Sequence, residues 1–106
     1  MANDYNPEPI PTGHISLRDE ILELVEVLAE NAHDIWALKR LQDDWILGPE
    51  RDDKKRQHPC LVPYPRLPPN EQDYDRAMVM ETILAMHALG FTISRARIDA
   101  SVELAP

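Results

Sequence analysis

The distribution of proline limits where this chain can form helices. Ten prolines occur in 106 residues, and nine of them lie within residues 7–11 and 49–69. An interior proline removes a helical hydrogen bond and clashes with the preceding turn. Residues 12–48 and 70–105 contain no proline. These two stretches are therefore predicted to hold the helices of one mainly α domain spanning residues 1–106, and residues 1–13 are expected to form an extended arm.

The first proline-free stretch predicts a helix from about Leu17 to about Trp45. Ser16 is a suitable N-cap, and Asp19 lies in the first turn, where the helix dipole favours negative charge. Apolar residues at steps of three, four or seven indicate one buried face. This stripe comprises Leu17, Ile21, Leu24, Leu28, Ile35, Leu38 and Leu41. Gly48 and the proline after it are expected to end the helix.

The second proline-free stretch predicts a helix from about Asn70 to about Leu89. Asn70 is an acceptable N-cap, and Gly90 is suited to the position after the helix. The intervening residues 46–69 are rich in proline and charge, and they are predicted to form one long connection. Residues 94–106 are expected to form a short helix or a frayed tail.

The expected architecture is two antiparallel helices with the proline-rich connection lying across them. The connection contains an apolar group at residues 60–64, which is expected to be held against the helices as a short strand. Residues 91–93 are a second expected strand. These two segments and the N-terminal arm could pair with one another.

Charge and composition exclude several classes of protein. The chain has 19 acidic and 11 basic residues, a net charge of -8, which argues against nucleic-acid binding. A single cysteine, Cys60, excludes an intrachain disulfide. No apolar run approaches the roughly 20 residues of a membrane span, and the first residues lack the features of a signal peptide. A cytoplasmic protein that does not bind membranes is therefore expected.

The sequence offers little support for catalysis or a metal centre. Three glycines leave no room for a glycine-rich phosphate loop. The four histidines are too scattered for a zinc site, and the spacing of a calcium-binding loop is absent. Cys60 lies between a proline and a leucine, an apolar setting that disfavours the reactive thiolate. We therefore expect no enzyme activity, no metal and no cofactor.

A series of motifs resembles the ryanodine receptor repeat, or RyR domain. Residues 29–37, with the sequence AENAHDIWA, resemble the AEN-H--WA signature of that family. Further matching positions follow in the family's order: Trp45, Gly48 to Asp53, His58 to Tyr64, Leu67-Pro68, Tyr74, Glu81-Thr82 and Ala88 to Gly90. The resemblance covers about residues 5–93.

This resemblance carries expectations about fold and assembly. It implies a mainly helical repeat with two antiparallel helices and short strands. In animal calcium-release channels such repeats occur as tandem pairs in the cytoplasmic assembly, outside the pore, and single-repeat proteins also occur in bacteria. The tandem pairs pack with approximate two-fold symmetry. A single repeat of the bacterial type is thus expected to recover this contact as a homodimer.

Two residues of the first predicted helix could contribute to a ligand pocket. Trp36 could form an aromatic wall, and Arg40, one turn later, could contact an anionic aromatic ligand. Alternatively, Trp36 packs at the edge of the core, and Arg40 pairs with Asp43 or Asp44, which is the interpretation we favour. If the helix continues to Trp45, the two tryptophans point about 180° apart, so that one would be buried and the other exposed.

The charged connection supplies the other candidate ligand contacts. Its basic residues could contact a phosphate: Arg51, Lys54, Lys55, Arg56 and His58. Alternatively, Asp52 and Asp53 neutralise these cations in a solvated loop. Asn31 and His33 are expected to hold the connection onto the helix by hydrogen bonds.

Two functions follow from these observations. The first is a module that recognises a small molecule, a nucleotide included, at a pocket lined by Trp36, Arg40 and residues 51–58. The second is a structural protein-interaction domain in which the same residues only hold the connection.

Overall fold

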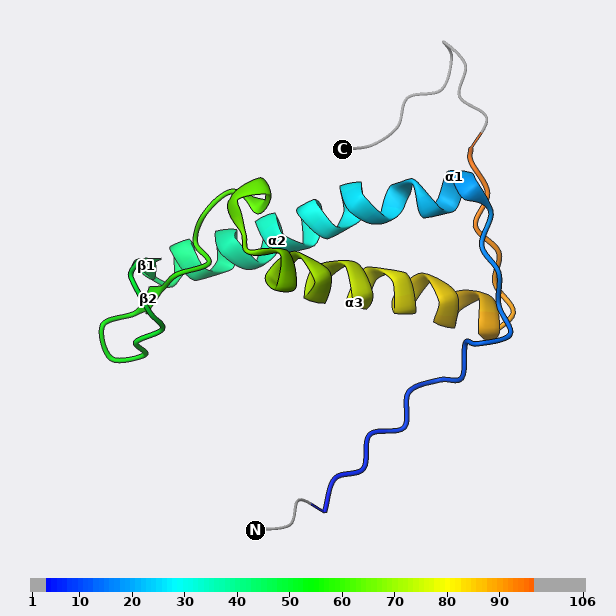
Figure 1. Cartoon of the computed structure of the whole chain (residues 1–106), viewed down its shortest axis with the longest axis horizontal. Helices are drawn as coiled ribbons and strands as arrows, with labels where there is room; N and C mark the ends of the chain where they lie inside the picture. The colour runs from blue at the N-terminus through cyan, green and yellow to red at the C-terminus, as the bar shows by residue number, and fades with distance from the viewer. Residues whose placement is uncertain (1–3, 97–106) are drawn as a thin grey trace.

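The computed structural model describes residues 4–96. Its elements are α1 (Asp19–Leu22), α2 (Leu24–Gln42), β1 (Ile46–Leu47), β2 (Gln57–His58), the 3-10 helix η1 (Tyr64–Arg66) and α3 (Pro69–Ala88). Figure 1 shows α2 and α3 side by side, with β1 and β2 beyond the end of α2. The prediction of a mainly helical domain is confirmed. Most of the expected tail, residues 97–106, lies outside the described part of the chain.

The first predicted helix is interrupted near its start and ends earlier than expected. α1 ends at Leu22 and α2 begins at Leu24, with no side-chain hydrogen bond capping either helix. α2 then ends at Gln42 rather than near Trp45. The cause is Asp44, which adopts a left-handed backbone with φ 67°. Aspartate tolerates this conformation better than most residues, so the chain turns before it reaches the glycine.

The buried face of this helical segment differs from the predicted stripe. Buried positions recur every four residues, at Ile21, Val25, Ala29 and His33. Five residues of the predicted stripe are instead 37–57% exposed: Leu24, Leu28, Ile35, Leu38 and Leu41. The prediction was wrong because it ranked positions by hydrophobicity. A small alanine allows close packing against α3, and a histidine can be buried when its ring finds a hydrogen-bond partner.

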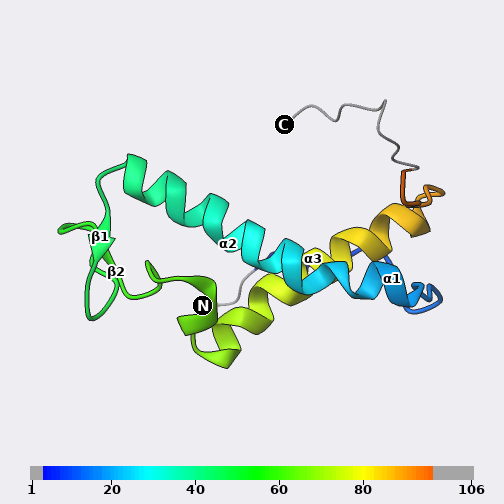
Figure 2. The same ribbon diagram turned by 90° about the horizontal axis from the view of Figure 1, so that it is seen from above.

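Two adjoining apolar clusters hold α2 and α3 together. The first joins Ile21 and Val25 to Ile83, near the end of α3, with Leu17 and Ile93 packed against it. The second comprises Ala29, Tyr64 and Leu67, with Val79 of α3, Cys60 and Val62 packed against it. The start of α2 thus contacts the end of α3, and η1 covers the next turns of α2. Figure 2 shows the two helices crossing where the first turns of α2 pass the middle of α3.

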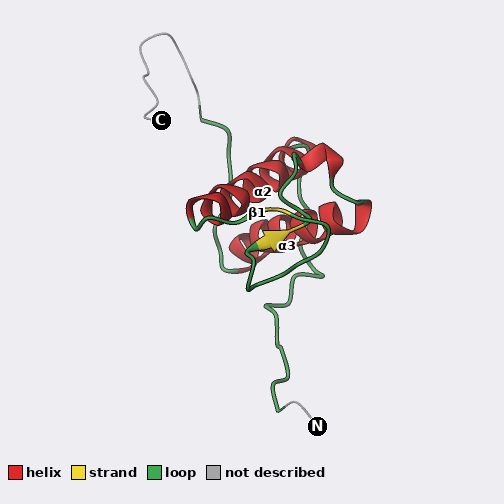
Figure 3. Cartoon of the chain, turned by 90° about the vertical axis from the view of Figure 1, so that its left-hand side faces the viewer, coloured by secondary structure: helices red, strands yellow, loops and turns green. Residues whose placement is uncertain are grey.

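The strands occur in the connection, away from the expected positions. β1 and β2 are parallel, with Ile46 opposite Gln57 and Leu47 opposite His58. Gly48 is required here, since a Cβ atom at this position would lie 2.5 Å from Cβ of Gln57. Residues 60–64 and 91–93 form no strand. In the first of these segments Pro63 lacks the N–H group that a strand ladder needs. Figure 3 views the molecule from the end where the two strands lie.

The limits of α3 agree closely with the prediction. The helix runs from Pro69 to Ala88, one residue away from the expected bounds at each end. Pro69 occupies the first turn, where its missing N–H costs nothing. Gly90 has φ 96°, and the N–H of Phe91 donates to the carbonyl of Met86 at 3.0 Å. This is the expected glycine termination of a helix.

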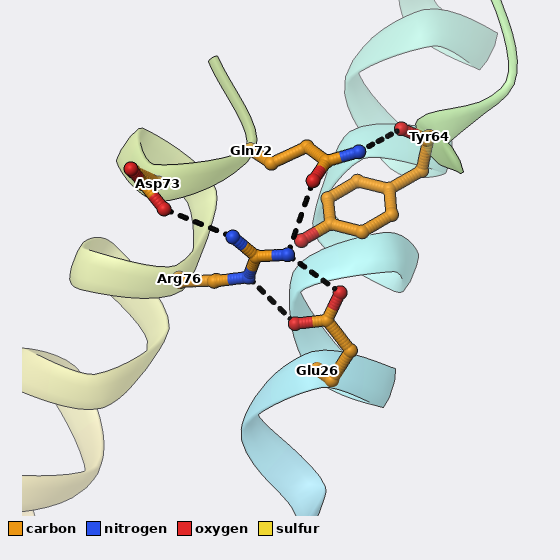
Figure 4. Close-up of polar contacts among 5 residues, drawn as sticks. All are labelled: Glu26, Tyr64, Gln72, Asp73 and Arg76. Atoms are coloured by element: carbon orange, nitrogen blue, oxygen red, sulfur yellow. Dashed lines mark hydrogen bonds and ion pairs between the residues drawn. The ribbon is translucent and has the colours of Figure 1, made fainter. Parts of the chain in front are cut away.

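A polar network ties α3 to both α2 and η1 (Figure 4). The guanidinium of Arg76 donates to both carboxylate oxygens of Glu26, at 2.6 and 3.0 Å, and to Asp73 at 2.9 Å. It also donates to Gln72, whose side-chain amide donates to the backbone carbonyl of Tyr64 at 2.9 Å. The hydrogen bonds from Arg76 lower the pKa of Glu26. Within residues 4–96, no helix is long and apolar enough to cross a membrane.

Candidate functional site

A row of aromatic and imidazole rings extends from η1 to the end of α2. The ring of His33 lies 6.2 Å from that of Tyr64 and stacks on Trp36 at 5.6 Å, measured between centroids. Trp36 meets His58 edge-on at 4.8 Å, and His58 lies 6.4 Å from Trp45. The α2 members are three residues apart, which places them on one face. Residues from α2, β2 and η1 therefore share one cluster.

His33 fastens the connection to α2, as the sequence predicts. Its side chain is buried, and its Nε2 lies 2.7 Å from the carbonyl oxygen of Val62. A carbonyl only accepts, so Nε2 carries the proton in this contact. Asn31, the other residue expected in this role, is exposed, and its side chain makes no hydrogen bond within residues 4–96.

Arg40 lies against both tryptophans. Its Cζ atom is 4.6 Å from the ring centroid of Trp45 and 5.6 Å from that of Trp36, distances typical of cation–π contacts. The predicted ion pair with Asp43 or Asp44 does not form in the structure.

The expected divergence of the two tryptophans is also wrong, because it assumed a continuous helix. The left-handed turn at Asp44 redirects the chain, and the N–H of Trp45 donates to the carbonyl of Arg40 at 2.9 Å. Trp45 is therefore buried against the same arginine that contacts Trp36. Trp36 itself is half-buried.

His58 lies between the two tryptophans, held by the strand pair. Its Nδ1 accepts the N–H of Cys60 at 3.0 Å, which leaves the proton of the neutral ring on Nε2. Burial lowers the pKa of His58, and the charges of Arg51 and Arg40 lower it further. The neutral imidazole is thus the favoured form, suited to packing against indole rings.

A pocket of about 220 Å³ opens beside this row of rings, between α2, the connection and α3. It is lined by His33, Trp36, His58, Cys60, Leu67, Glu71, Tyr74 and Asp75. We refer to it as the aromatic pocket. Two of its residues, Trp36 and His58, are candidates from the sequence. Glu71, Tyr74 and Asp75 were missed; their spacing of three and four residues on α3 is the only sequence signal that could have indicated them.

The remaining basic candidates lie in the loop between the strands, outside the lining of the aromatic pocket. Arg51 pairs with Asp53 at 2.9 Å. The carboxylate of Asp52 accepts the backbone N–H groups of residues 54 and 55 at 3.0 Å each, which shapes the turn. Arg56 has φ 53°, and its guanidinium donates to the carbonyl of Asp43 at 2.8 Å. Lys54 is exposed.

The cysteine in the pocket has the properties of a packing residue. Cys60 is half-buried, and burial raises the pKa of its thiol, an effect that Glu71 and Asp75 increase. A protonated thiol is a weak nucleophile and a poor metal ligand. Within residues 4–96, no group of three or more His, Cys, Asp or Glu side chains is arranged to hold a metal ion.

The arrangement of these residues agrees with a comparison against protein-family models. The model of the RyR domain matches residues 5–95, which include every residue of the ring cluster and of the aromatic pocket. The matched segment begins in the N-terminal arm and ends beyond α3. The chain belongs to the RyR domain family.

Proposed function

We propose that this RyR domain is a non-enzymatic module that recognises a small molecule in the aromatic pocket. The observation that carries the proposal is the pocket itself, a space of about 220 Å³ lined by Trp36, Tyr74 and two histidines. Binding sites are typically concave, with apolar and aromatic walls and a few convergent polar groups. The volume is below the usual range for drug-sized ligands. The ligand, or the part of it that enters, is therefore compact.

The wall of the pocket is preorganised, which favours binding over a merely structural role for Trp36. The indole ring of Trp36 stacks on His33, which is itself held by the carbonyl of Val62. The same indole also contacts His58 and Arg40. A ligand need not order this wall when it binds, so that less conformational entropy is lost.

The absence of catalysis is part of the proposal. His58 uses Nδ1 to accept a backbone N–H, and Cys60 has a raised thiol pKa. Neither residue is therefore arranged as an activated nucleophile or its base.

A nucleotide is one ligand class to test. Its base would enter the aromatic pocket, and its phosphate would lie toward Arg51, whose charge acts on His58. For such a ligand, Arg51, Lys54 and Arg56 would be the phosphate contacts, while Arg40 supports the tryptophans.

A second candidate function is a protein-interaction domain, including a homodimer. It is favoured by an apolar face of α2 that no other described element covers: Leu24, Val27, Leu28, Ile35, Leu38 and Leu41, each 37–62% exposed. Such a face is commonly an interaction surface. Light scattering over a range of protein concentrations tests it, because a dimer on this face would dissociate on dilution.

A thermal-shift screen tests the first function. Purified protein would be heated with a panel of nucleotides and small organic ions, since a ligand of the folded state raises the melting temperature with RT ln(1 + [L]/Kd). Trp36→Ala should abolish a shift while the folded state persists, and Arg51→Ala should abolish it only for a phosphate-bearing ligand. No shift with any compound of the panel would contradict the proposal and favour the interaction domain.

A further inference from the structure

Two carboxylates on the α3 wall of the aromatic pocket lack a counter-ion. Glu71 and Asp75 lie one helical turn apart, and both line the pocket. Within residues 4–96, neither side chain takes part in an ion pair or a hydrogen bond. By contrast, Asp73 between them pairs with Arg76 at 2.9 Å. Two like charges at this spacing repel each other, so a positive group between them would be stabilised by both.

The charges of Glu71 and Asp75 also act on Cys60, on the opposite side of the pocket. Burial raises the pKa of Asp75, with His33 acting against the shift and Glu71 adding to it. The same two carboxylates also raise the pKa of Cys60 beyond the effect of burial. Cys60 belongs to the connection rather than to α3, so the carboxylates act on both sides of the pocket.

The nearby cations do not line the pocket and have other partners. Arg51 pairs with Asp53, and Arg40 lies over the ring of Trp45. The two histidines that line the pocket are also engaged: His33 donates through Nε2 to the carbonyl of Val62, and His58 accepts the N–H of Cys60 through Nδ1.

We infer that the ligand of the aromatic pocket is a small organic cation, with an ammonium group or a planar amidinium group between Glu71 and Asp75. Carboxylates bind such a group by charge and by accepting its N–H donors. Trp36 and Tyr74 line the pocket with aromatic rings, which stabilise organic cations. This inference rests on the proposed function of the same pocket, and it adds the sign of the ligand's charge.

Benzamidine is a suitable probe, with benzamide as its neutral isostere. Isothermal titration would measure both with the full-length protein and with the double variant Glu71→Gln/Asp75→Asn. The matched control is Glu30→Gln/Asp34→Asn, which removes two carboxylates one turn apart on the exposed face of α2. We expect benzamidine to bind, the pocket variant to weaken it at least tenfold, the control to change it less than twofold, and benzamide not to bind.

The outcomes separate this inference from the proposed function. Equal binding of benzamidine and benzamide, or undiminished benzamidine binding by the folded pocket variant, would overturn the cation inference. If the pocket variant does not fold, the cation inference is decided by comparing the affinities of benzamidine and benzamide for the unaltered protein. Binding of benzamide or a nucleotide that Trp36→Ala abolishes would leave the proposed function standing without the cation. No binding of any probe would overturn both.

Discussion

The register of the helical segment 19–42 can be tested by one substitution made at two positions. Ile21 and Ile35 both belong to the apolar stripe of the sequence, but Ile21 is 4% exposed and Ile35 is 52% exposed. Ile21→Ala removes the equivalent of about three methylene groups from the cluster with Val25 and Ile83, a loss of about 2.4 kcal/mol before any cavity is counted. With the cavity, we expect about 3 kcal/mol.

The exposed position should behave differently. Ile35→Ala removes little buried surface and improves helix propensity, so its effect on the free energy of unfolding should stay within about 0.5 kcal/mol. Urea denaturation followed by tryptophan fluorescence and circular dichroism measures both values, with an unchanged m-value as the check for two-state unfolding. In a thermal scan, Ile21→Ala should lower the melting temperature by about 10–20 °C.

Protein concentration makes the test decisive. If Ile35→Ala costs as much as Ile21→Ala when light scattering finds a monomer, the buried face is the predicted stripe and the structural register is refuted. If the cost of Ile35→Ala appears only at high concentration, the residue lies in an oligomer interface. That result would support the interaction-domain function.

Three further predictions concern the connection. Gly48→Ala should lower the free energy of unfolding by about 1–3 kcal/mol, because its Cβ would lie 2.5 Å from Cβ of Gln57; Gly13→Ala, which meets no atom within 4 Å, is the control in the same denaturation assay. The pKa of His58, measured by NMR titration, should be below 6.5. The folded state binds this proton less tightly than the unfolded state. Stability should therefore decline as pH falls below about 6.5 and through the lowered pKa. If the melting temperature of His58→Gln falls with decreasing pH as steeply as that of the unaltered protein, this prediction is contradicted. Cys60 should react with iodoacetamide at pH 8 more slowly than a cysteine peptide, since burial raises the pKa of its thiol. An equal rate would contradict the burial of this thiol.

Features encoded by short stretches of sequence were predictable. The ends of α3 follow from the prolines at its start, with Pro68 rather than Asn70 at the N-cap, and from Gly90, which adopts the left-handed backbone that the prediction requires. The role of His33 was also predictable, since a polar residue on a helix beside a long connection needs a partner. These inferences depend on a few neighbouring residues, or on one rule about buried polar groups.

Features that depend on tertiary contacts were not predictable. The buried face of α2 depends on Ala29, whose small size matters only because α3 packs against it. The position of Trp45 depends on a left-handed backbone at Asp44, and aspartate does not require that conformation. From the sequence alone, Glu71 and Asp75 are typical of a solvated acidic face. Their role in the pocket becomes apparent only in the fold, where the connection lies opposite α3.

The family signature acquires a physical meaning in this fold. His33 and Trp36 belong both to the packing that fixes the connection on α2 and to the lining of the aromatic pocket. The structural and ligand-binding interpretations of these residues are therefore two consequences of one arrangement. A ligand in the pocket would contact α2, β2 and α3 through Trp36, His58 and Asp75. It would thus stabilise the docking of the connection, so binding and the order of this segment must be coupled.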